Sequence, residues 1–499
     1  MSRLKIASIL FLASTLFLKF SSMFRDLVIA HYFGASYVVD AYNAAMIIPN
    51  AFILFMLTGM KDAFVPSYIK YDSKNEGFSH LTNIVKGTFY IGLTISVIGA
   101  LISPVIIPIM FPSFNPDGTQ IAIWTAAIYF FSVFLVGINA VYEGFFDAKG
   151  KYSFSTFSQT IVVLCTIGSA VFFHKELGAY SLAIGYLVGT VLSFLIKLVY
   201  LKPKSFVDWK QKINRKEIEV FYRIFIPVGL TIMVGQINLI VNNLYAGNFG
   251  EGVISYLNYA FRLVSIPQAI FGVTIATIIY PLLAKARASD NHTLFKQGIE
   301  KGLTIMFLLL APTIAGMVLL MEEIVTIVYQ RGAFNTEATL ATTDVSYYYL
   351  GSVLFYSIQV IIAKGFYTLE KGNLILRVGL MSILLNIILN FIFSKWIGYQ
   401  GLALSASVVG FLYTLIAFII LYRIIGGLSL KSIGSEYLKI AASTIIMGGI
   451  IYFISPFFSN LNLYLYVLIL TIIGCVAYII LLYIMKSSSL KDIIARKVK

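Results

Sequence analysis

Long apolar segments separated by short polar loops run through the whole chain. A helix needs about 20 apolar residues to cross the hydrocarbon core of a bilayer, and fourteen segments meet this requirement. They are expected at approximately 6–32, 38–60, 84–111, 119–146, 154–174, 178–201, 221–247, 252–282, 303–329, 339–368, 376–397, 400–424, 438–457 and 463–485. The pattern predicts an all-α polytopic membrane protein with about fourteen transmembrane helices.

Composition favours the same fold class. The 499 residues are 59% hydrophobic and 12% charged, and the mean hydropathy is +0.88, which leaves too little polar surface for a soluble globule. The net charge of +15 does not indicate a nucleic-acid partner, because the Lys and Arg residues lie in loops between apolar segments. Cys165 and Cys475 lie inside apolar segments, so neither a disulfide framework nor a metal site is expected.

Basic residues are concentrated in every second loop, and this bias indicates the orientation. The alternate loops contain only Lys175, Arg331 and Lys395. The positive-inside rule therefore places both termini in the cytoplasm, which requires an even number of spans. The N-terminal apolar segment continues past thirty residues without a small-residue cleavage site, so we interpret it as the first spanning helix.

An internal repeat is visible at an offset of 220 residues. Residues 113–119 resemble 333–339, and about thirty residues later 144–150 resemble 365–372. A duplication predicts two six-helix lobes related by a pseudo-twofold axis along the membrane normal, with the substrate site between them. The expected parts are an N-terminal lobe at 1–201, a basic cytoplasmic loop at 202–220, a C-terminal lobe at 221–424, two further helices at 438–485, and a basic cytoplasmic tail at 486–499.

Several ionisable residues fall inside the predicted spans. They include Lys19, Arg25, Asp26, Asp40 and Arg262, and also Asp344 and Lys364. Each costs about 2.5–3.5 kcal/mol at bilayer depth, so we expect them to line a wet cavity. Two interpretations remain open: Arg25 pairs with Asp26 or Asp40 as a structural lock, or the cations form an anion site in which Arg and Lys bind a diphosphate.

Proline and glycine inside the spans also allow two interpretations. Each is tolerated as a harmless kink in a membrane helix, but Pro49, Gly59 and Pro267 occupy places that suggest bending when the lobes move. The lysine-rich loop at 202–219 serves either as a positive-inside anchor or as a contact to anionic membrane lipids. The sequence contains no P-loop motif, and no paired carboxylates have metal-ligand spacing, so an ATPase or a membrane glycosyltransferase is not favoured.

Short motifs along nearly the whole chain resemble the MurJ family of lipid II flippases, within the multidrug, oligosaccharidyl-lipid and polysaccharide exporter superfamily. The motifs are Arg25-Asp26, Phe33-Gly34-Ala35, Asp40-Ala41-Tyr42, Pro49-Asn50, Ala63-Phe64-Val65-Pro66, Tyr259-Ala260-Phe261-Arg262-Leu263 with Pro267, and Tyr329-Gln330-Arg331-Gly332-Ala333-Phe334. The resemblance implies a two-lobe fold with a V-shaped central cavity, and a hydrophobic groove near 438–485 that holds a polyprenyl tail.

The same resemblance implies a set of site residues. The family's cavity cations correspond to Lys19 (an Arg in the family), Arg25 and Arg262, and its cavity acid corresponds to Asp40. We add Asp26 and Asn50 as neighbours of this set. Two positions depart from the family: one of its arginines falls at about Ile53, and its Glu-Gly pair is replaced by Thr58-Gly59.

A sodium site of some family members would fall on amides here. The matching residues are Asn242 and Asn390, with Asn386 beside the latter, and they predict at most a weak ion site because sodium favours charged oxygen ligands. No cofactor is expected, and coupling to Na⁺ or H⁺ is left open.

The expected function is transfer of a lipid-linked saccharide from the inner to the outer leaflet of a bacterial cytoplasmic membrane. The resemblance favours the peptidoglycan precursor lipid II, which is built on undecaprenyl diphosphate, as the substrate. The protein is expected to be a monomer, and transport is expected to be driven by membrane potential or an ion gradient. Because an arginine is missing at Ile53, a flippase for capsule, O-antigen or teichuronic-type units stays open. A cation-coupled drug exporter is less favoured, because the expected cavity is cationic.

Overall fold

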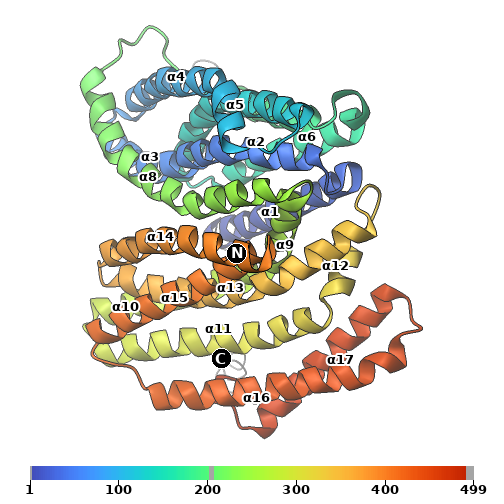
Figure 1. The fold of residues 1–499 in the computed structure, drawn as a ribbon. Helices are drawn as coiled ribbons and strands as arrows, with labels where there is room; N and C mark the ends of the chain where they lie inside the picture. The colour runs from blue at the N-terminus through green and yellow to red at the C-terminus, as the bar shows by residue number, and fades with distance from the viewer. Residues whose placement is uncertain (1–2, 202–206, 491–499) are drawn as a thin grey trace. The chain divides into compact units, whose positions relative to one another are not determined.

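The computed structural model describes residues 3–201 and 207–490, and all regular structure in these residues is helical (Figure 1). The elements are α1 (Arg3–Phe33), α2 (Tyr37–Leu54), the π-turn η1 (Phe55–Gly59), α3 (Met60–Asp72), α4 (Gly77–Met110), α5 (Pro116–Ala148), α6 (Tyr152–Leu177), α7 (Tyr180–Leu201), α8 (Arg215–Ala246), η3 (Gly247–Phe249), α9 (Val253–Val264), the π-turn η4 (Gln268–Gly272), α10 (Val273–Ala288), α11 (His292–Leu319), α12 (Met321–Tyr329), α13 (Thr336–Thr368), α14 (Gly372–Ile397), α15 (Gln400–Ile424), α16 (Leu430–Ile454), η5 (Ser455–Phe458) and α17 (Leu463–Ile484).

The helices confirm a polytopic all-α membrane protein. Among the described residues, twelve helical segments are long and apolar enough to cross a membrane. Outside those twelve, α1 and α8 contain 31 and 32 residues, which at about 1.5 Å per residue exceeds the thickness of the hydrocarbon core. Together these segments agree with the predicted fourteen spans.

Several helices extend beyond the predicted apolar segments. Helix α4 begins at Gly77 instead of about residue 84, and α11 begins at His292 instead of about 303. Hydropathy marks only the part of a helix that contacts hydrocarbon, whereas these helices continue into polar residues at the membrane surface. The span predicted at 252–282 is not one helix, because α9 ends at Val264 and the chain passes Pro267 and η4 before α10 begins.

The predicted repeat is present in the helix boundaries. Helices α5 and α13 each contain 33 residues and begin 220 positions apart, and α6 and α14 each contain 26 residues at the same offset. Helices α7 and α15 also begin 220 positions apart. Equal lengths at one offset confirm that the two halves share a pattern of helices, while α16 and α17 follow after the repeat.

The chain forms two compact units whose boundary differs from the predicted one. Unit 1 comprises Met1–Ser255 and Arg331–Asn335, and unit 2 comprises Tyr256–Gln330 and Thr336–Lys499. We predicted a boundary at 201–221, but α8 packs against α2, α3 and α4 and so belongs to unit 1. A contributing contact is the close approach of η1 to α8, where a Cβ atom on Gly59 would lie 3.1 Å from the Cα of Gly229.

The predicted basic segments are partly folded onto their units. The Lys86 ammonium on α4 donates hydrogen bonds to the carbonyl oxygens of Trp209 (3.0 Å) and Gln211 (2.7 Å), which holds the loop after α7 against α4. In unit 2 the Glu436 carboxylate accepts a hydrogen bond from the Ser487 hydroxyl at 2.8 Å. Residues 202–206 of the predicted loop and 491–499 of the predicted tail lie outside the described residues.

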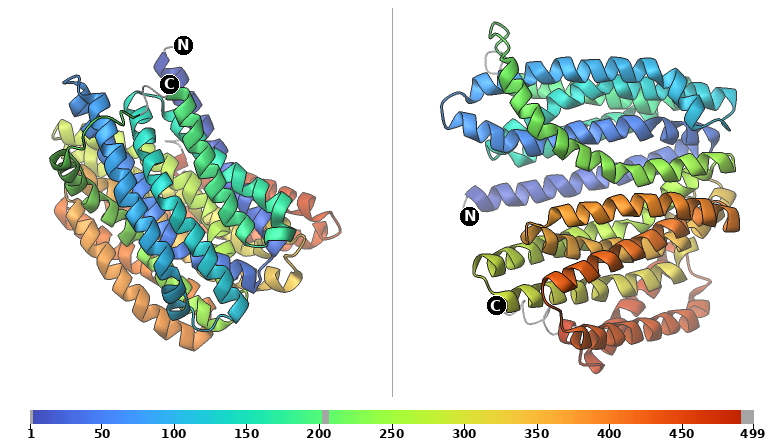
Figure 2. Two further views of the ribbon diagram at one scale, coloured as in Figure 1. Left: turned by 90° about the horizontal axis from the view of Figure 1, so that it is seen from above. Right: turned by 60° about the vertical axis from the view of Figure 1, so that its left-hand side comes forward.

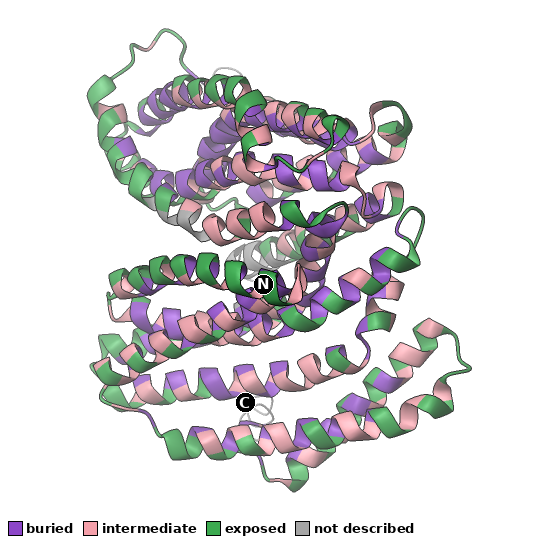
Figure 3. Ribbon diagram, in the orientation of Figure 1, coloured by how far each residue is buried: buried purple, intermediate pink, exposed green. Residues whose placement is uncertain are grey.

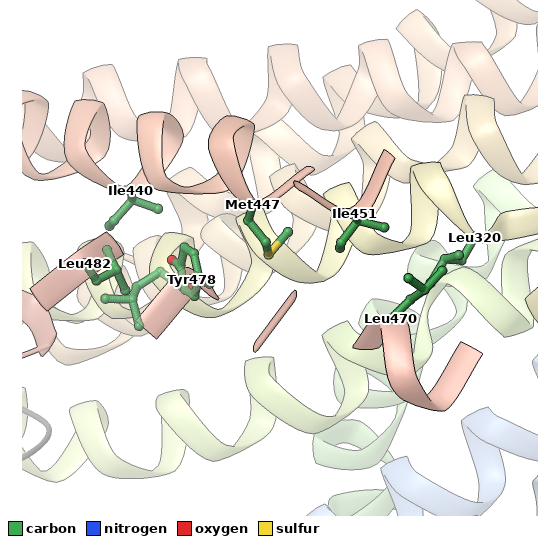
Figure 4. Close-up of a cluster of buried hydrophobic side chains, with 8 residues drawn as sticks. Leu320, Ile440, Met447, Ile451, Leu470, Tyr478 and Leu482 are labelled. Carbon is green, nitrogen blue, oxygen red and sulfur yellow. The ribbon is translucent and has the colours of Figure 1, made fainter. Parts of the chain in front are cut away.

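Helix α5 packs against α2, α3, α4 and α7. It runs beside α4 in Figure 1, and Figure 2 shows the same helices in two further views. Residues 136–144 of α5 are all buried, in contrast to α17 in unit 2, whose outward apolar residues are exposed as expected for contact with lipid (Figure 3). The inner faces of α16 and α17 pack against α11 through a buried apolar cluster that includes Met447, Leu470 and Tyr478 (Figure 4).

The pair α6–α7 approaches closely through two glycines spaced as GxxxG. A Cβ atom on Gly189 would lie 2.7 Å from the Cα of Val162, and one on Gly185 would lie 2.8 Å from the carbonyl oxygen of Cys165. Small residues allow such backbone contact between membrane helices, where lipid supplies no competing hydrophobic force. This contact fixes the distance between two helices that border the cavity described below.

Substitution of Gly189 by valine is expected to separate α6 from α7 and to destabilise the protein by about 1–3 kcal/mol, the usual cost of overpacking. Thermal unfolding of the purified protein in detergent measures this loss. The control is Gly168→Val on α6, because a Cβ atom there meets nothing within 4 Å. Equal melting temperatures for the two variants would contradict the proposed role of the glycine contact.

Candidate functional site

A polar cavity of about 440 Å³ lies inside unit 1, between α1, α2, α5, α6 and α7. Its charged and amide-bearing lining residues are Lys19, Arg25, Asn50, Asn139, Glu143 and Gln159. Helices α2, α5, α6 and α7, which carry most of these residues, are long and apolar enough to span a membrane. Helix α1, which carries Lys19 and Arg25, is long enough to do so. Charged and polar groups at such depth indicate a water-filled site.

Helix α1 supplies the cationic wall. Thr15, Leu18, Lys19, Ser22 and Arg25 recur at intervals of three and four residues, so they occupy one face of the helix and all line the cavity. Lys19 is exposed, and within the described residues it has no ion-pair partner. Its charge is therefore available to an anionic ligand.

Arg25 is paired with its neighbour. Its Nη2 lies 3.0 Å from Oδ1 of Asp26 and its Nε lies 3.2 Å from the same oxygen. This is one of the two interpretations left open by the sequence. The guanidinium side chain is still 25% exposed and borders the cavity, and the pair uses two of its five N–H donors. Arg25 therefore serves as a structural partner and still presents donors to a ligand.

Helix α2 contributes one amide and an apolar stretch. Asn50 borders the polar cavity, whereas the adjacent Pro49 borders a separate apolar pocket between α2, α4 and α5. Ile53 also borders the polar cavity, at the position where the resemblance implied an arginine. The cavity wall therefore lacks the positive charge that an arginine would supply at this position.

Glu143 borders the cavity from α5 and belongs to a network of ionic groups that the sequence analysis missed. Glu143 on α5 is 1% exposed, and its Oε1 lies 3.2 Å from Nζ of Lys197 on α7, which is fully buried. Lys197 also donates to the side-chain oxygen of Asn139 at 2.7 Å. Lys61 on α3 lies 2.9 Å from Oδ2 of Asp147, one turn beyond Glu143. The signal in the sequence was Glu143 and Asp147, spaced four residues apart at the end of an apolar helix.

Asp40 does not line this cavity. It is 2% exposed, and its carboxylate accepts hydrogen bonds from the backbone N–H groups of Gly252 (2.6 Å) and Ser255 (2.8 Å) and from the Ser255 hydroxyl (2.5 Å). These are the groups that a helix leaves unsatisfied at its N-terminus, so Asp40 caps α9 from α2. Asp40 therefore joins two helix ends within unit 1.

The remaining candidates lie elsewhere. Arg262 lies half-buried on α9 in unit 2 and is not among the residues that line the cavity of unit 1. Asn242 is half-buried on α8 in unit 1, whereas Asn386 and Asn390 are buried on α14 in unit 2, where the Asn390 amide donates to Asn386 at 3.4 Å. Gly59 ends η1, and Pro267 directly precedes η4.

Removal of the Asp40 carboxylate is expected to leave the first turn of α9 unsatisfied. Asp40→Ala should destabilise the protein by about 1.5–3 kcal/mol, the range for hydrogen bonds to a charged group, and Asp40→Asn should lose less because one acceptor remains. Thermal unfolding in detergent measures both. The control is Asp117→Ala, at an exposed position on α5, which should lose little stability. An equally small loss of stability in Asp40→Ala would contradict the capping role.

Comparison with known proteins gives consistent results. A family model described as lipid II flippase MurJ matches residues 29–472. The lipid II flippase MurJ of Burkholderia cenocepacia is 25% identical over 419 residues, covering 81% of each chain. The probable lipid II flippase MurJ of Aquifex aeolicus is 27% identical and covers 82% of each.

Solved structures agree with the sequence comparisons. A structure titled as the lipid II flippase MurJ in an inward closed conformation has a TM-score of 0.83 at 26% identity, covering 97% of this chain and 100% of the other. An inward-facing multidrug resistance transporter of the MATE family has a TM-score of 0.71 at 13% identity, covering 84% of this chain and 98% of the other, which shows a shared fold. Since the family model spans most of the chain, the protein belongs to the family of the lipid II flippase MurJ.

Proposed function

We propose that this protein is a flippase that moves lipid II, a saccharide-linked polyprenyl diphosphate, from the inner to the outer leaflet of a bacterial cytoplasmic membrane. The observation that supports this most strongly is a cavity between spanning helices that is lined by two cations, three amides and one paired carboxylate, in a chain of the MurJ family. A transporter needs no catalytic group, and no role in bond cleavage is assigned to any residue of the cavity.

The cationic wall suits a diphosphate. An Arg guanidinium binds phosphate oxygens with paired N–H donors, and a Lys ammonium adds a compact charge. Lys19 offers an uncompensated charge and Arg25 offers its remaining donors, so the headgroup would exchange its hydration for contacts with α1. Arg262, Asp26 and Asn50 remain candidates for contact with the headgroup as it crosses. The polyprenyl tail would stay in lipid.

An apolar pocket of about 200 Å³ in unit 2 suits a hydrocarbon tail. Leu303, Phe355, Phe411, Ile433 and Tyr437 are among the residues that line it, from α11, α13, α15 and α16. The resemblance placed a tail-binding groove near 438–485, and this pocket borders the beginning of α16. We propose it as one end of that groove.

Membrane potential can drive the cycle. Moving a negative charge outward across a membrane that is negative inside releases about 2.3 kcal/mol per charge per 100 mV, and a diphosphate carries more than one charge. We propose that the membrane potential drives transport and that both termini lie in the cytoplasm. Asn242, Asn386 and Asn390 would form at most a weak Na⁺ site. Bending at η1 and η4, near Pro49 and Pro267, would let the helices follow the movement, since π-turns interrupt regular helical hydrogen bonding.

Complementation tests the proposed function. A bacterial host depleted of its own lipid II flippase should grow when it expresses this protein. Lys19→Gln should reduce rescue, because it removes the free cation at the cavity, and Arg25→Gln combined with Asp26→Asn should abolish it without leaving a lone charge. Lys175→Gln, an exposed substitution at the end of α6, should rescue fully.

The outcomes separate the alternatives. Wild-type protein that is inserted in the membrane but does not restore growth would contradict lipid II as the substrate, and would favour a capsule, O-antigen or teichuronic-type unit instead. Full rescue by the Lys19 and Arg25–Asp26 variants would contradict the anion site. Immunoblots of membrane fractions establish equal expression of all variants.

A further inference from the structure

Gln159 on α6 occupies an unusual position at the edge of the buried ionic network. Its Nε2 donates a hydrogen bond of 2.7 Å to Oε2 of Glu143, and the residue is half-buried and lines the cavity. A carboxylate can only accept hydrogen bonds, so Glu143 determines which end of the amide faces it. The amide oxygen and one remaining N–H of Gln159 are therefore available on the cavity side.

Glu143 is itself held from several sides. Lys197 approaches its Oε1 at 3.2 Å, and the Ser158 hydroxyl donates to the same oxygen at 3.2 Å. Lys61 lies 3.8 Å from Oε2. A buried ion pair of this kind seldom adds net stability, because the cost of removing two charges from water offsets their attraction. Its clear consequence here is geometric: Glu143 cannot turn away from Gln159.

Several other polar side chains at the cavity are already engaged. Thr15 and Ser22 donate their hydroxyl hydrogens to carbonyl oxygens of α1 itself, at 2.8 and 2.9 Å. Asn139 donates to the Thr190 carbonyl and accepts from Lys197. Among the cavity-lining amides of the described chain, the oxygens of Asn50 and Gln159 accept no hydrogen bond, whereas that of Asn139 accepts from Lys197, and Gln159 alone is oriented by a buried carboxylate.

We propose that Gln159 is a specificity-determining residue that binds the hydroxyl or acylamino groups of the saccharide attached to the diphosphate, and that Glu143 is its positioning residue. This inference rests on the proposed function, because it assigns the second part of the same headgroup. One acceptor and one donor held side by side match a group that itself donates and accepts. The cations of α1 would bind the phosphates, while Gln159 on α6 would form hydrogen bonds with the sugar.

This arrangement predicts discrimination between lipids with and without a sugar. A site built to hydrogen-bond a polar group rejects a ligand that lacks the group, since its own polar atoms are then left without a partner. A polyprenyl diphosphate without a saccharide should therefore bind through Lys19 and Arg25 only. Spent carrier lipid would be bound more weakly than loaded carrier.

The test measures binding of two probes to the purified full-length protein in detergent: a polyprenyl diphosphate, and the same lipid carrying an N-acetylated sugar. Gln159→Met keeps the size of the side chain and removes its hydrogen bonds. We expect about a tenfold loss of affinity for the glycosylated lipid, equivalent to one or two hydrogen bonds, and no change for the bare diphosphate. Lys19→Gln should weaken both probes.

Two controls separate positioning from folding. Gln359→Met on α13 in unit 2 is the matched substitution of a half-buried glutamine, whose amide donates to the Tyr413 hydroxyl at 3.0 Å, and it should leave both affinities unchanged. Glu143→Gln combined with Lys197→Met removes both members of the ion pair, and it should reproduce the selective loss seen with Gln159→Met.

Equal weakening of both probes by Gln159→Met, or no change for either, would overturn the inference while leaving the proposed function intact. Wild-type protein that binds neither probe would overturn the proposed function itself. A selective loss in both the Gln159 variant and the Glu143–Lys197 variant would support the chain of contacts from Lys197 through Glu143 to Gln159.

Discussion

The cost of placing charge in a low-dielectric membrane governs this structure. An ionised side chain at bilayer depth must be paired or must face water. Glu143 and Lys197 satisfy the first condition, with both side chains buried, and Lys19 satisfies the second, since it is exposed at a cavity. Arg25 satisfies both, because it pairs with Asp26 and still borders the cavity. The division between paired and available charges is what defines the site.

Sequence patterns predicted the fold well because hydropathy and repeat spacing are properties of single segments. The 220-residue offset, read from two short motifs, reappears in the bounds of α5 and α13. Two features were not predicted, for physical reasons. The hydrophobic pattern ends where contact with lipid ends, so it did not reveal the polar extension of α4 to Gly77. The pattern also carries no information on which helices α8 packs against.

The site was only partly predictable. Lys19, Arg25 and Asn50 border one cavity within unit 1, and Asp40 caps α9. The network of Lys61, Glu143, Asp147 and Lys197 was missed because its members lie on three helices far apart in the sequence. Such partners become visible only when the helices are packed together. Glycines 185 and 189, which bring α7 against α6, are part of what packs them.

The most direct test of the central claim is transport by the purified protein in liposomes. Lipid II is incorporated, and the appearance of its headgroup on the opposite leaflet is followed while a potential is imposed across the membrane. Our account predicts that wild-type protein accelerates this movement, that a potential favouring outward movement of anions accelerates it further, and that Lys19→Gln reduces both effects. Movement at the same rate without protein, or a rate indifferent to both the potential and Lys19, would contradict it.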